Sequence, residues 1–193
     1  MRIKKKVNFV PKVIMASEGK NIVLPMSEYI CQFRDVGRFE GYCRACARYG
    51  TCWACPPFDF NMDKLLAEYR NILLFAVKVD VPSGLTDSAA LLDSVRVVMD
   101  RRLLVKEAEL SGRAFFAGTC RLCGTGVGDY EKDGDCTRKT GLPCRHPEMV
   151  RPSLESFGFD IGRTTKELFG LELKWGKEGS LPEYYILVGG VAF

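Results

Sequence analysis

Apolar and polar residues follow one another in patterns that predict both strands and helices. Residues 72–79 form a continuous apolar run rich in branched side chains, which predicts a buried strand. After a turn at Pro82-Ser83-Gly84, apolar residues recur at helical spacing from Thr86 or Asp87 to about Leu110 and predict a long helix. The expected buried stripe of that helix comprises Leu91, Leu92, Val95, Val98, Met99 and Leu103.

Shorter elements are predicted on either side of this strand and helix. Asn61 can cap a helix over residues 61–70 whose apolar face carries Leu65, Leu66 and Tyr69. Gly112 stands where the long helix should be capped, and residues 113–117 predict a second strand.

The C-terminal third predicts one more helix and two closing strands. Pro152 suits a helix start, and Thr164-x-x-Glu167 has the spacing of a capping box. Gly170 can end that helix, and residues 171–175 and 184–188 predict the two strands. The resulting order is β-α-β-α-β-β. We therefore expect an α+β fold, a mixed β-sheet with helices packed on one face.

Length and composition narrow the class of protein. A chain of 193 residues with 47% apolar and 27% charged residues suits a soluble globular protein, and we expect residues 1–193 to form a single domain. A formal net charge of +4 is too small to indicate nucleic-acid binding. The basic start, Met1 to Lys6, is followed by a segment broken by Pro11 and Lys12, which is unlike a signal peptide. No run of about 18 apolar residues exists, so we expect a cytoplasmic protein without a membrane span.

Nine cysteines and a single histidine give the chain its most informative feature. The cysteine count is odd, and C-x-x-C pairs recur, which in a cytosolic chain favours metal binding over disulfides. The cysteines lie in two loops that we place at about residues 31–60 and 118–150. The candidate metal ligands are Cys31, Cys43, Cys46, Cys52, Cys55, Cys120, Cys123, Cys136 and Cys144.

The spacing of the first group favours iron–sulfur clusters over zinc. The four cysteines of the pattern C-x2-C-x5-C-x2-C-P-P begin at Cys43 and end at Cys55. Only five residues separate Cys46 from Cys52, whereas zinc ribbons place about 12–20 residues between their pairs. Pro56 follows Cys55 directly, as is common in cluster-binding loops. We therefore expect two cysteine-ligated centres, both 4Fe-4S clusters, with zinc as the alternative.

These motifs together resemble the predicted metal-binding protein family known as domain of unknown function 2284. The resemblance runs from about Tyr29 to Ala192. It is carried by Tyr49-Gly50 with Trp53-x-Cys55-Pro56-Pro57, by Cys120-x-Leu122-Cys123, by Cys144-Arg145-His146-Pro147, and by the segment from Arg151 to Asp160. The resemblance implies a cysteine-ligated metal or iron–sulfur protein and supplies no reaction.

Two departures from the family pattern affect the expected ligands. The position of Cys52 is often not cysteine in that family, whose first group is Cys43, Cys46 and Cys55. Cys52 and Cys31 then compete to be the fourth ligand of the first centre, unless a group other than cysteine takes that position. The interval from Cys123 to Cys136 is also expanded, which makes the role of Cys136 less defined.

Other motifs near the cysteines have weaker functional interpretations. Gly124-x-Gly126-x-Gly128 lacks the third glycine of a nucleotide loop at the right offset. His146 is best explained as a loop histidine bonded to backbone, with metal ligation and proton transfer as alternatives. Basic residues around the cysteines suit a solvated surface, compensation of anionic centres, or docking of an acidic partner; they are Arg44, Arg48, Arg121, Arg138, Lys139, Arg145 and Arg151.

Three functions remain open from the sequence. The first is an iron–sulfur electron carrier with a redox protein partner, whose centres are fully ligated by cysteine. The second is an enzyme in which one centre has only three cysteine ligands and an open iron. The third is a zinc-stabilised interaction module without redox activity.

Overall fold

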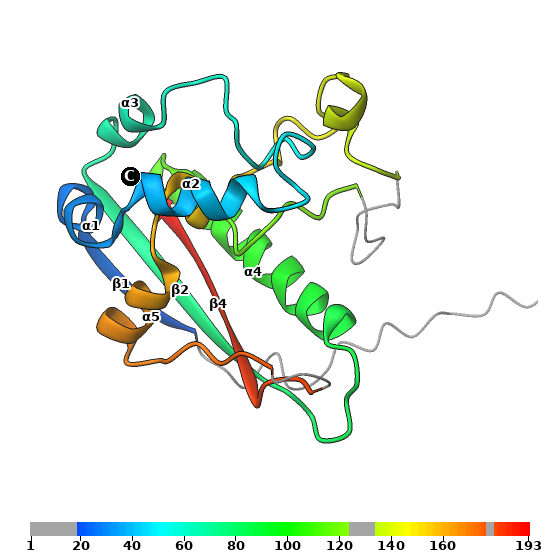
Figure 1. The fold of residues 1–193 in the computed structure, drawn as a ribbon. Coiled ribbons are helices and arrows are strands. Elements are labelled where there is room, and N and C mark those ends of the chain that lie inside the picture. Colours follow the sequence, from blue (N-terminus) through cyan, green and yellow to red (C-terminus); the bar gives the residue numbers. More distant parts are fainter. Residues whose placement is uncertain (1–18, 124–133, 177–179) are drawn as a thin grey trace, which may run out of the picture.

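The computed structural model describes residues 19–123, 134–176 and 180–193 and has an α+β architecture (Figure 1). Four strands form one sheet in the order β1-β2-β4-β3. The strands are β1 (Lys20–Pro25), β2 (Asn71–Asp80), β3 (Arg113–Phe115) and β4 (Tyr184–Ala192). The helices are α1 (Met26–Phe33), α2 (Val36–Arg44), α3 (Met62–Ala67), α4 (Ala89–Leu110) and α5 (Ile161–Phe169), with short 3-10 turns η2 (Thr137–Thr140) and η3 (Glu155–Phe157).

All neighbouring strands in this sheet are antiparallel, so the expectation of a mixed sheet is wrong. β2, α4 and β3 follow one another as strand, helix and strand, the arrangement that connects two strands running in the same direction. The C-terminal strand β4 lies between β2 and β3 and pairs with both, from Ile72↔Ala192 to Asp80↔Tyr184 on one side. That insertion separates the two strands that run in the same direction.

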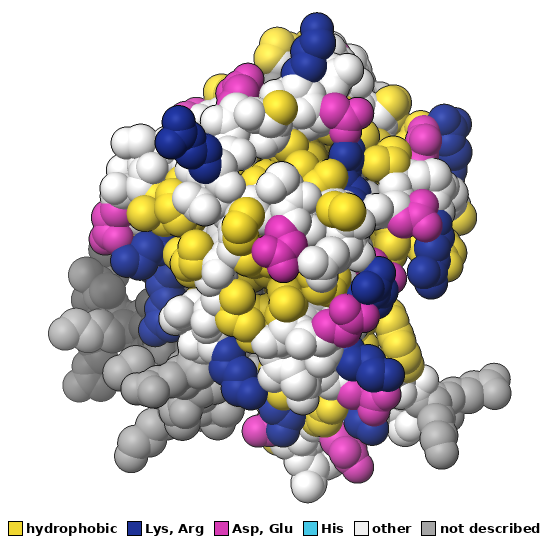
Figure 2. All heavy atoms as spheres, turned by 90° about the vertical axis from the view of Figure 1, so that its left-hand side faces the viewer, with side chains coloured by type: hydrophobic (Ala, Val, Ile, Leu, Met, Phe, Trp, Pro, Cys, Tyr) yellow, Lys and Arg dark blue, Asp and Glu magenta, His cyan; other side chains and the backbone are white. Residues whose placement is uncertain are grey.

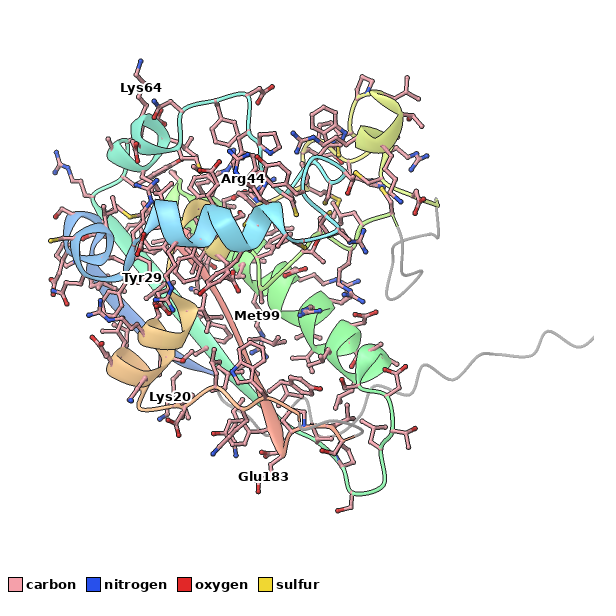
Figure 3. The ribbon with its side chains drawn as sticks, in the orientation of Figure 1. Lys20, Tyr29, Arg44, Lys64, Met99 and Glu183 are labelled. Carbon is pink, nitrogen blue, oxygen red and sulfur yellow. The ribbon has the colours of Figure 1, made fainter. Side chains whose placement is uncertain are left out.

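Helices pack on both faces of the sheet, which corrects the expectation of a single covered face. Ile72, Leu74 and Ala76 of β2 lie in one apolar cluster with α1, α5 and η3 residues. Val77 and Val79 lie in a second cluster with the α4 stripe that includes Val95, Met99 and Leu103. Met99 points from α4 toward the sheet and Tyr29 lies on the other side (Figure 3). A continuous apolar run is the pattern of a strand covered on both faces, as β2 is.

Several element boundaries match their sequence signals. Asn61 caps α3 by accepting a hydrogen bond from the Lys64 amide, and Gly170 ends α5 in a left-handed conformation. The strands predicted at 72–79 and 184–188 are confirmed as β2 and the first part of β4. The long helix is confirmed as α4. The strand predicted at 113–117 ends at Phe115, and Phe116 forms only an isolated bridge with Ser153.

Other local predictions are wrong. Ser111, with a φ of 51°, and not Gly112, adopts the left-handed conformation at the end of α4. Asp160 caps α5, while the Thr164 hydroxyl lies inside the helix and donates to the Asp160 carbonyl oxygen. The cap that replaces Thr164 is also local, because the Asp160 side chain accepts from the Arg163 amide.

The last third also departs from its predicted elements. No helix starts at Pro152, where a loop leads into η3 and the Pro152 carbonyl accepts from the Phe116 amide. Residues 171–175 form no strand. Because β4 already has β2 and β3 as its two neighbours, the segment from 171 to 175 has no place beside it.

The surface of the described residues has a mixed character. Figure 2 shows one face on which basic, acidic and apolar side chains are interspersed, and no patch of one charge gathers on it. In the described part of the chain, no helix is long and apolar enough to span a bilayer.

Candidate metal centre

The two cysteine-rich segments, far apart in sequence, meet at one end of the molecule (Figure 1). The Trp53 indole donates from Nε1 to the Leu142 carbonyl at 3.2 Å and to the Thr137 hydroxyl at 3.3 Å. Arg138 crosses in the other direction and donates to the carbonyls of Cys52 at 2.9 Å, Cys55 at 2.5 Å, and Pro57. Its guanidinium also lies 5.2 Å from the centre of the Trp53 ring. These contacts fix one segment against the other.

Short turns present the cysteines of the first segment. The Cys46 amide donates to the Cys43 carbonyl and the Cys55 amide to the Cys52 carbonyl, each at 3.0 Å, so both C-x-x-C pairs close a turn. Gly50, with a φ of 67°, lets the chain reverse between the two pairs, and its amide donates to the Pro56 carbonyl at 2.8 Å. The spacing in the sequence therefore becomes two adjacent turns with thiols at both ends.

Five cysteines line one cavity of about 260 Å³. Cys52 comes from the first segment, whereas the other four come from the second; they are Cys120, Cys123, Cys136 and Cys144. We call this the five-cysteine cavity. Its volume greatly exceeds the ~10–15 Å³ that one water molecule requires. Arg48, Trp53, Arg121 and Val150 also contribute to its walls.

Backbone amides donate to four of the cysteine sulfurs in a repeated pattern. The Arg48 amide lies 3.5 Å from Cys46 Sγ, and the His146 amide lies 3.4 Å from Cys144 Sγ. The same bond, from the residue two positions later, reaches Cys52 from Ala54 and Cys120 from Leu122. Hydrogen bonds donated to a sulfur favour its thiolate form, which is the form that binds metals.

Cys52 is the point of contact between the two groups of thiols. Its thiol is hydrogen-bonded to the thiols of Cys120 and Cys55. These bonds lower the pKa of Cys52, and they raise the pKa values of Cys120 and Cys55, which act as donors. The side chain of Cys52 is buried, with 2% of its surface exposed.

The remaining thiols of the first segment form a second group beside the cavity. Cys43 and Cys55 both interact electrostatically with Cys46, and Cys55 Sγ lies 3.7 Å from the Thr119 hydroxyl. Burial raises the pKa of Cys43. We call Cys43, Cys46 and Cys55 the three-cysteine group. Cys31, in contrast, lies exposed on α1, and the whole of α2 separates that helix from the cysteine turns. It lines neither the five-cysteine cavity nor a second cavity, which is described next.

A separate cavity of about 190 Å³ adjoins the three-cysteine group at Cys43. Its walls are mostly apolar, from Val36, Pro56, Pro57, Phe58, Phe60 and Met62, with Glu40 and Ser156 as polar members. The cavity lies between α2, the loop after Cys55 and η3.

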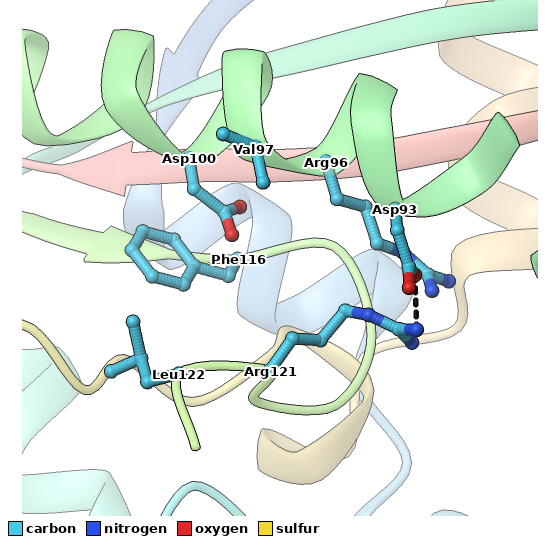
Figure 4. A pocket seen from close by; sticks show the side chains of 7 residues that line it. All are labelled: Asp93, Arg96, Val97, Asp100, Phe116, Arg121 and Leu122. Atoms are coloured by element: carbon cyan, nitrogen blue, oxygen red, sulfur yellow. Dashed lines mark ion pairs between the residues drawn. The ribbon is translucent and has the colours of Figure 1, made fainter. Parts of the chain in front are cut away.

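Partly buried ion pairs attach the second segment to α4. Arg121 pairs with Asp93 of α4 in a small pocket that also contains Arg96 and Asp100 (Figure 4). Burial raises the pKa of Asp100 to about 7, although the positive charges of Arg96 and Arg121 lower it. The long helix therefore supports the loop that carries Cys120 and Cys123.

A second pair reinforces this attachment. Arg151 pairs with Glu107 of α4, donating to Oε2 at 2.7 Å, and the same oxygen accepts from the Ala114 amide. Glu107 thus joins the exit of the second segment to the start of β3.

Most basic residues near the cysteines have intramolecular partners. Arg44 pairs with Glu40 at 2.6 Å, Lys139 pairs with Asp135 at 2.8 Å, and Arg145 donates to the Asp135 carbonyl at 2.9 Å. Arg48 lines the five-cysteine cavity. The backbone amide of His146 donates to the Cys144 sulfur, which places this histidine beside the thiols of the second segment.

The donor set of the site fits a soft metal centre. Cysteine sulfurs are the preferred ligands of zinc and of iron–sulfur clusters. Within the described ranges, no three or more Cys, His, Asp or Glu side chains converge closely enough to hold a metal ion. The thiols are instead distributed around a cavity and beside it.

The fold and the site thus define an α+β protein whose two cysteine segments meet around one cavity. The predicted metal-binding protein family DUF2284 matches residues 32–191, and the chain belongs to this family. The resemblance noted from the motifs is therefore confirmed. Searches among curated proteins and solved structures found no match to the chain.

Sequence reasoning missed the residues that position the thiols. From the sequence, Arg138 is only one of several basic residues near the cysteines, and Trp53 is only part of the motif that carries the family resemblance. Asp93 and Glu107 are separated by 14 positions on one helix, so they lie on roughly the same side of it, about four turns apart. Two carboxylates on the face of a helix that otherwise packs on a sheet are a signal for buried arginine partners.

Proposed function

We propose that this protein is an iron–sulfur protein with two cysteine-ligated 4Fe-4S centres that transfers electrons to or from a redox protein partner. One observation carries the proposal: five cysteines from two distant segments line a single cavity, next to a group of three more. Family membership supports metal binding itself. A reducing compartment such as the cytoplasm is the setting in which these thiols stay available.

The spacing of the thiols favours a cluster over a single zinc ion. A zinc ion holds four sulfurs at about 2.3 Å, so the sulfurs must gather tightly around one point. The described cysteines form no such group, and those of the cavity surround a volume of about 260 Å³. A cluster of several irons holds its cysteines farther apart, because each sulfur binds a different iron.

The chain's own residues would hold and tune such centres. The cysteines would bind as thiolates, and the amides of Arg48, Ala54, Leu122 and His146 would stabilise their negative charge. Bound clusters supply one-electron redox chemistry, with a potential set partly by hydrogen bonds to sulfur. The contact between Cys52 and Cys55 joins the two groups and provides a short path between centres.

Exposed apolar side chains beside the cysteines support a protein partner. Tyr42, next to Cys43, is 59% exposed, and Leu142, two residues before Cys144, is 57% exposed. Apolar residues on a rim with charged neighbours such as Arg44 and Lys139 are typical of a transient docking surface.

A second candidate function is an enzyme in which one cluster keeps an open iron. The observation that favours it is the 190 Å³ cavity at Cys43, which could admit a small, largely apolar molecule to the three-cysteine group. A ligand in that cavity would contact Phe58, Phe60 and Met62, with Glu40 and Ser156 as polar partners.

The experiment that tests the proposed function is metal and sulfide analysis of protein purified without oxygen, together with an absorption spectrum. About eight irons and eight sulfides per chain, with broad absorption near 400 nm, are expected for two 4Fe-4S centres. About two zincs without visible absorption would overturn the proposal and leave the zinc-stabilised interaction module.

A further inference from the structure

The grouping of thiols in space differs from their grouping in sequence. In sequence, Cys52 belongs to the C-x2-C-x5-C-x2-C pattern with Cys43, Cys46 and Cys55. In space, Cys52 lines the cavity formed by the second segment, whereas none of its three sequence partners does so.

We propose that Cys52 ligates the centre held by the second segment, so that the four ligands of this centre are Cys52 and three of the second segment's four cysteines, and the first centre has three cysteine ligands. This inference rests on the proposed iron–sulfur function. It changes the ligand set that the sequence suggests, because Cys52 leaves the first centre. Cys31 does not replace it.

The position of Cys52 carries the first step. Its thiol is hydrogen-bonded to that of Cys120 as well as to that of Cys55, and of these two partners only Cys120 lines the cavity; Cys52 also interacts electrostatically with Cys144. Cys144 lines the same cavity, as does Cys123, which interacts with Cys120 and Cys144. Cys52 therefore has thiol neighbours from the second segment on the cavity side.

The way Cys52 is held carries the second step. Arg138, from the second segment, donates to the Cys52 carbonyl, and the neighbouring Trp53 donates to Leu142 of the same segment. The Ala54 amide donates to the Cys52 sulfur and fixes the position of the thiol. A buried thiol with this support, aimed into a cavity of thiols, is positioned as a ligand and not as a spare cysteine.

The place of Cys31 carries the third step. Cys31 lies on α1 and is exposed, while Cys43 lies near the end of α2. Nine residues of α2 correspond to about 13 Å of helix, and the cysteine turns continue away from α1 at its far end (Figure 1). Cys31 is therefore not available to complete the first centre, which is left with Cys43, Cys46 and Cys55. This is the ligand number that the enzyme alternative requires.

Iron and sulfide contents of single and double alanine variants, purified without oxygen, test the inference. We expect Cys52→Ala, Cys43→Ala and Cys120→Ala each to weaken one 4Fe-4S centre and to leave the other intact, so that each variant retains at least about four irons. The decisive comparison uses double variants. Cys52→Ala with Cys43→Ala should retain almost no iron, whereas Cys52→Ala with Cys120→Ala should still retain about four. Cys31→Ala is the matched control and should keep about eight.

The opposite pattern in the double variants would overturn the inference. If Cys52 serves the first centre, its combination with Cys43→Ala will retain about four irons and its combination with Cys120→Ala almost none. Failure of the proposed function gives a different result, namely wild-type protein without iron and sulfide.

A second set of variants separates ligand loss from misfolding. Cys52→Ser keeps nearly the same volume at this buried position and should reproduce the pairwise pattern in altered cluster spectra. Far-UV circular dichroism and gel filtration of every variant should match the wild type. If iron is lost only in variants that fail these checks, while folded Cys52→Ser keeps both centres unchanged, Cys52 is not a ligand.

Discussion

Arg138 joins the two cysteine segments through hydrogen bonds that no local sequence pattern predicts. Its guanidinium donates to three backbone carbonyls of the first segment and lies over Trp53. Hydrogen bonds from a charged group contribute about 1.5–3 kcal/mol each when well formed. A planar guanidinium can serve several acceptors at once, which the ammonium of lysine cannot do in the same geometry.

Replacing Arg138 should loosen the site without unfolding the sheet. We expect Arg138→Ala to lower the free energy of unfolding by about 1–3 kcal/mol and to speed the loss of metal to a chelator severalfold. Urea unfolding and chelator kinetics measure the two effects. Lys139→Ala, which removes an exposed pair with Asp135, is the control and should change either value little. Equal behaviour of the two variants would contradict the role assigned to Arg138.

Asp100 should make stability depend on pH in the direction opposite to that of most carboxylates. Burial raises its pKa to about 7 in the folded protein, above the ordinary value of 3.8. The folded state therefore binds a proton more tightly, and stability falls as pH rises from about 4 to about 7. Of the groups facing it, Arg96 and Arg121 oppose the shift, and Asp93 lies in the same pocket.

Asp100→Asn should remove this pH dependence. At pH 8 the variant should be more stable than the wild type by on the order of 2–4 kcal/mol, and near pH 4 the difference should vanish. Denaturant unfolding at both pH values, compared as the difference between variant and wild type, isolates Asp100 from the cysteines. Asp59→Asn, at an exposed position, is the control and should change the stability by no more than about 0.5 kcal/mol. A variant less stable at pH 8 would contradict the expected sign.

At the scale of elements, the packing of α4 and β3 against β4 decides where the second cysteine segment begins. Gly112 joins α4 to β3, and a Cβ there would overlap the carbonyl oxygen of Ala192 on β4. The glycine is required for this close approach and not for a left-handed turn, which Ser111 makes instead. β3 then leads directly to Cys120.

Gly112→Ala should therefore be strongly destabilising, by about 2–4 kcal/mol, because backbone atoms must move to relieve the overlap. Gly41→Ala is the matched control. Gly41 lies within α2, and beyond its chain neighbours and the backbone of its own helix nothing comes within 4 Å of the position of a Cβ, so alanine should stabilise the protein by up to about 1 kcal/mol. Thermal unfolding of both variants measures the contrast. A Gly112→Ala protein as stable as the wild type would show that β4 does not approach this closely.

At the scale of the whole molecule, the apolar core and the cysteine site are separate sources of order. Two apolar clusters on opposite faces hold the sheet, and none of the nine cysteines belongs to either. The cysteine segments contain mainly turns and depend on Arg138, Trp53 and the pairs with α4. Metal binding should therefore stabilise one end of the molecule more than the other.

Metal removal should lower stability while leaving the sheet folded. We expect the metal-free protein to have a lower melting temperature, because the metal binds the folded state only. Hydrogen exchange should show lost protection around residues 43–57 and 134–150, with amides of β2 and β4 still protected. Loss of protection throughout the sheet would contradict this division, and an unchanged melting temperature would show that the metal does not support the fold.

Local signals in the sequence are sufficient to predict an element when the residues that form it and end it lie within that element. The apolar run of β2 and the stripe of α4 were predicted because burial requires those periodicities wherever the partner lies. The Asn61 cap and the Gly170 stop were predicted because each acts within one turn of helix. The metal-binding family was recognisable because ligand spacing is itself a local property.

Only the tertiary structure decided features that depend on partners distant in the chain. β4 lies between β2 and β3 and is antiparallel to both. The residues of one strand do not specify this arrangement, because it depends on which other strands are available to pair with it. Cys52 lines a cavity together with Cys120 and Cys144 of the other segment, because its turn is held by Arg138 from that segment. The sequence by itself determined which residues are able to bind a metal, and the long-range hydrogen bonds determined which of them are brought together.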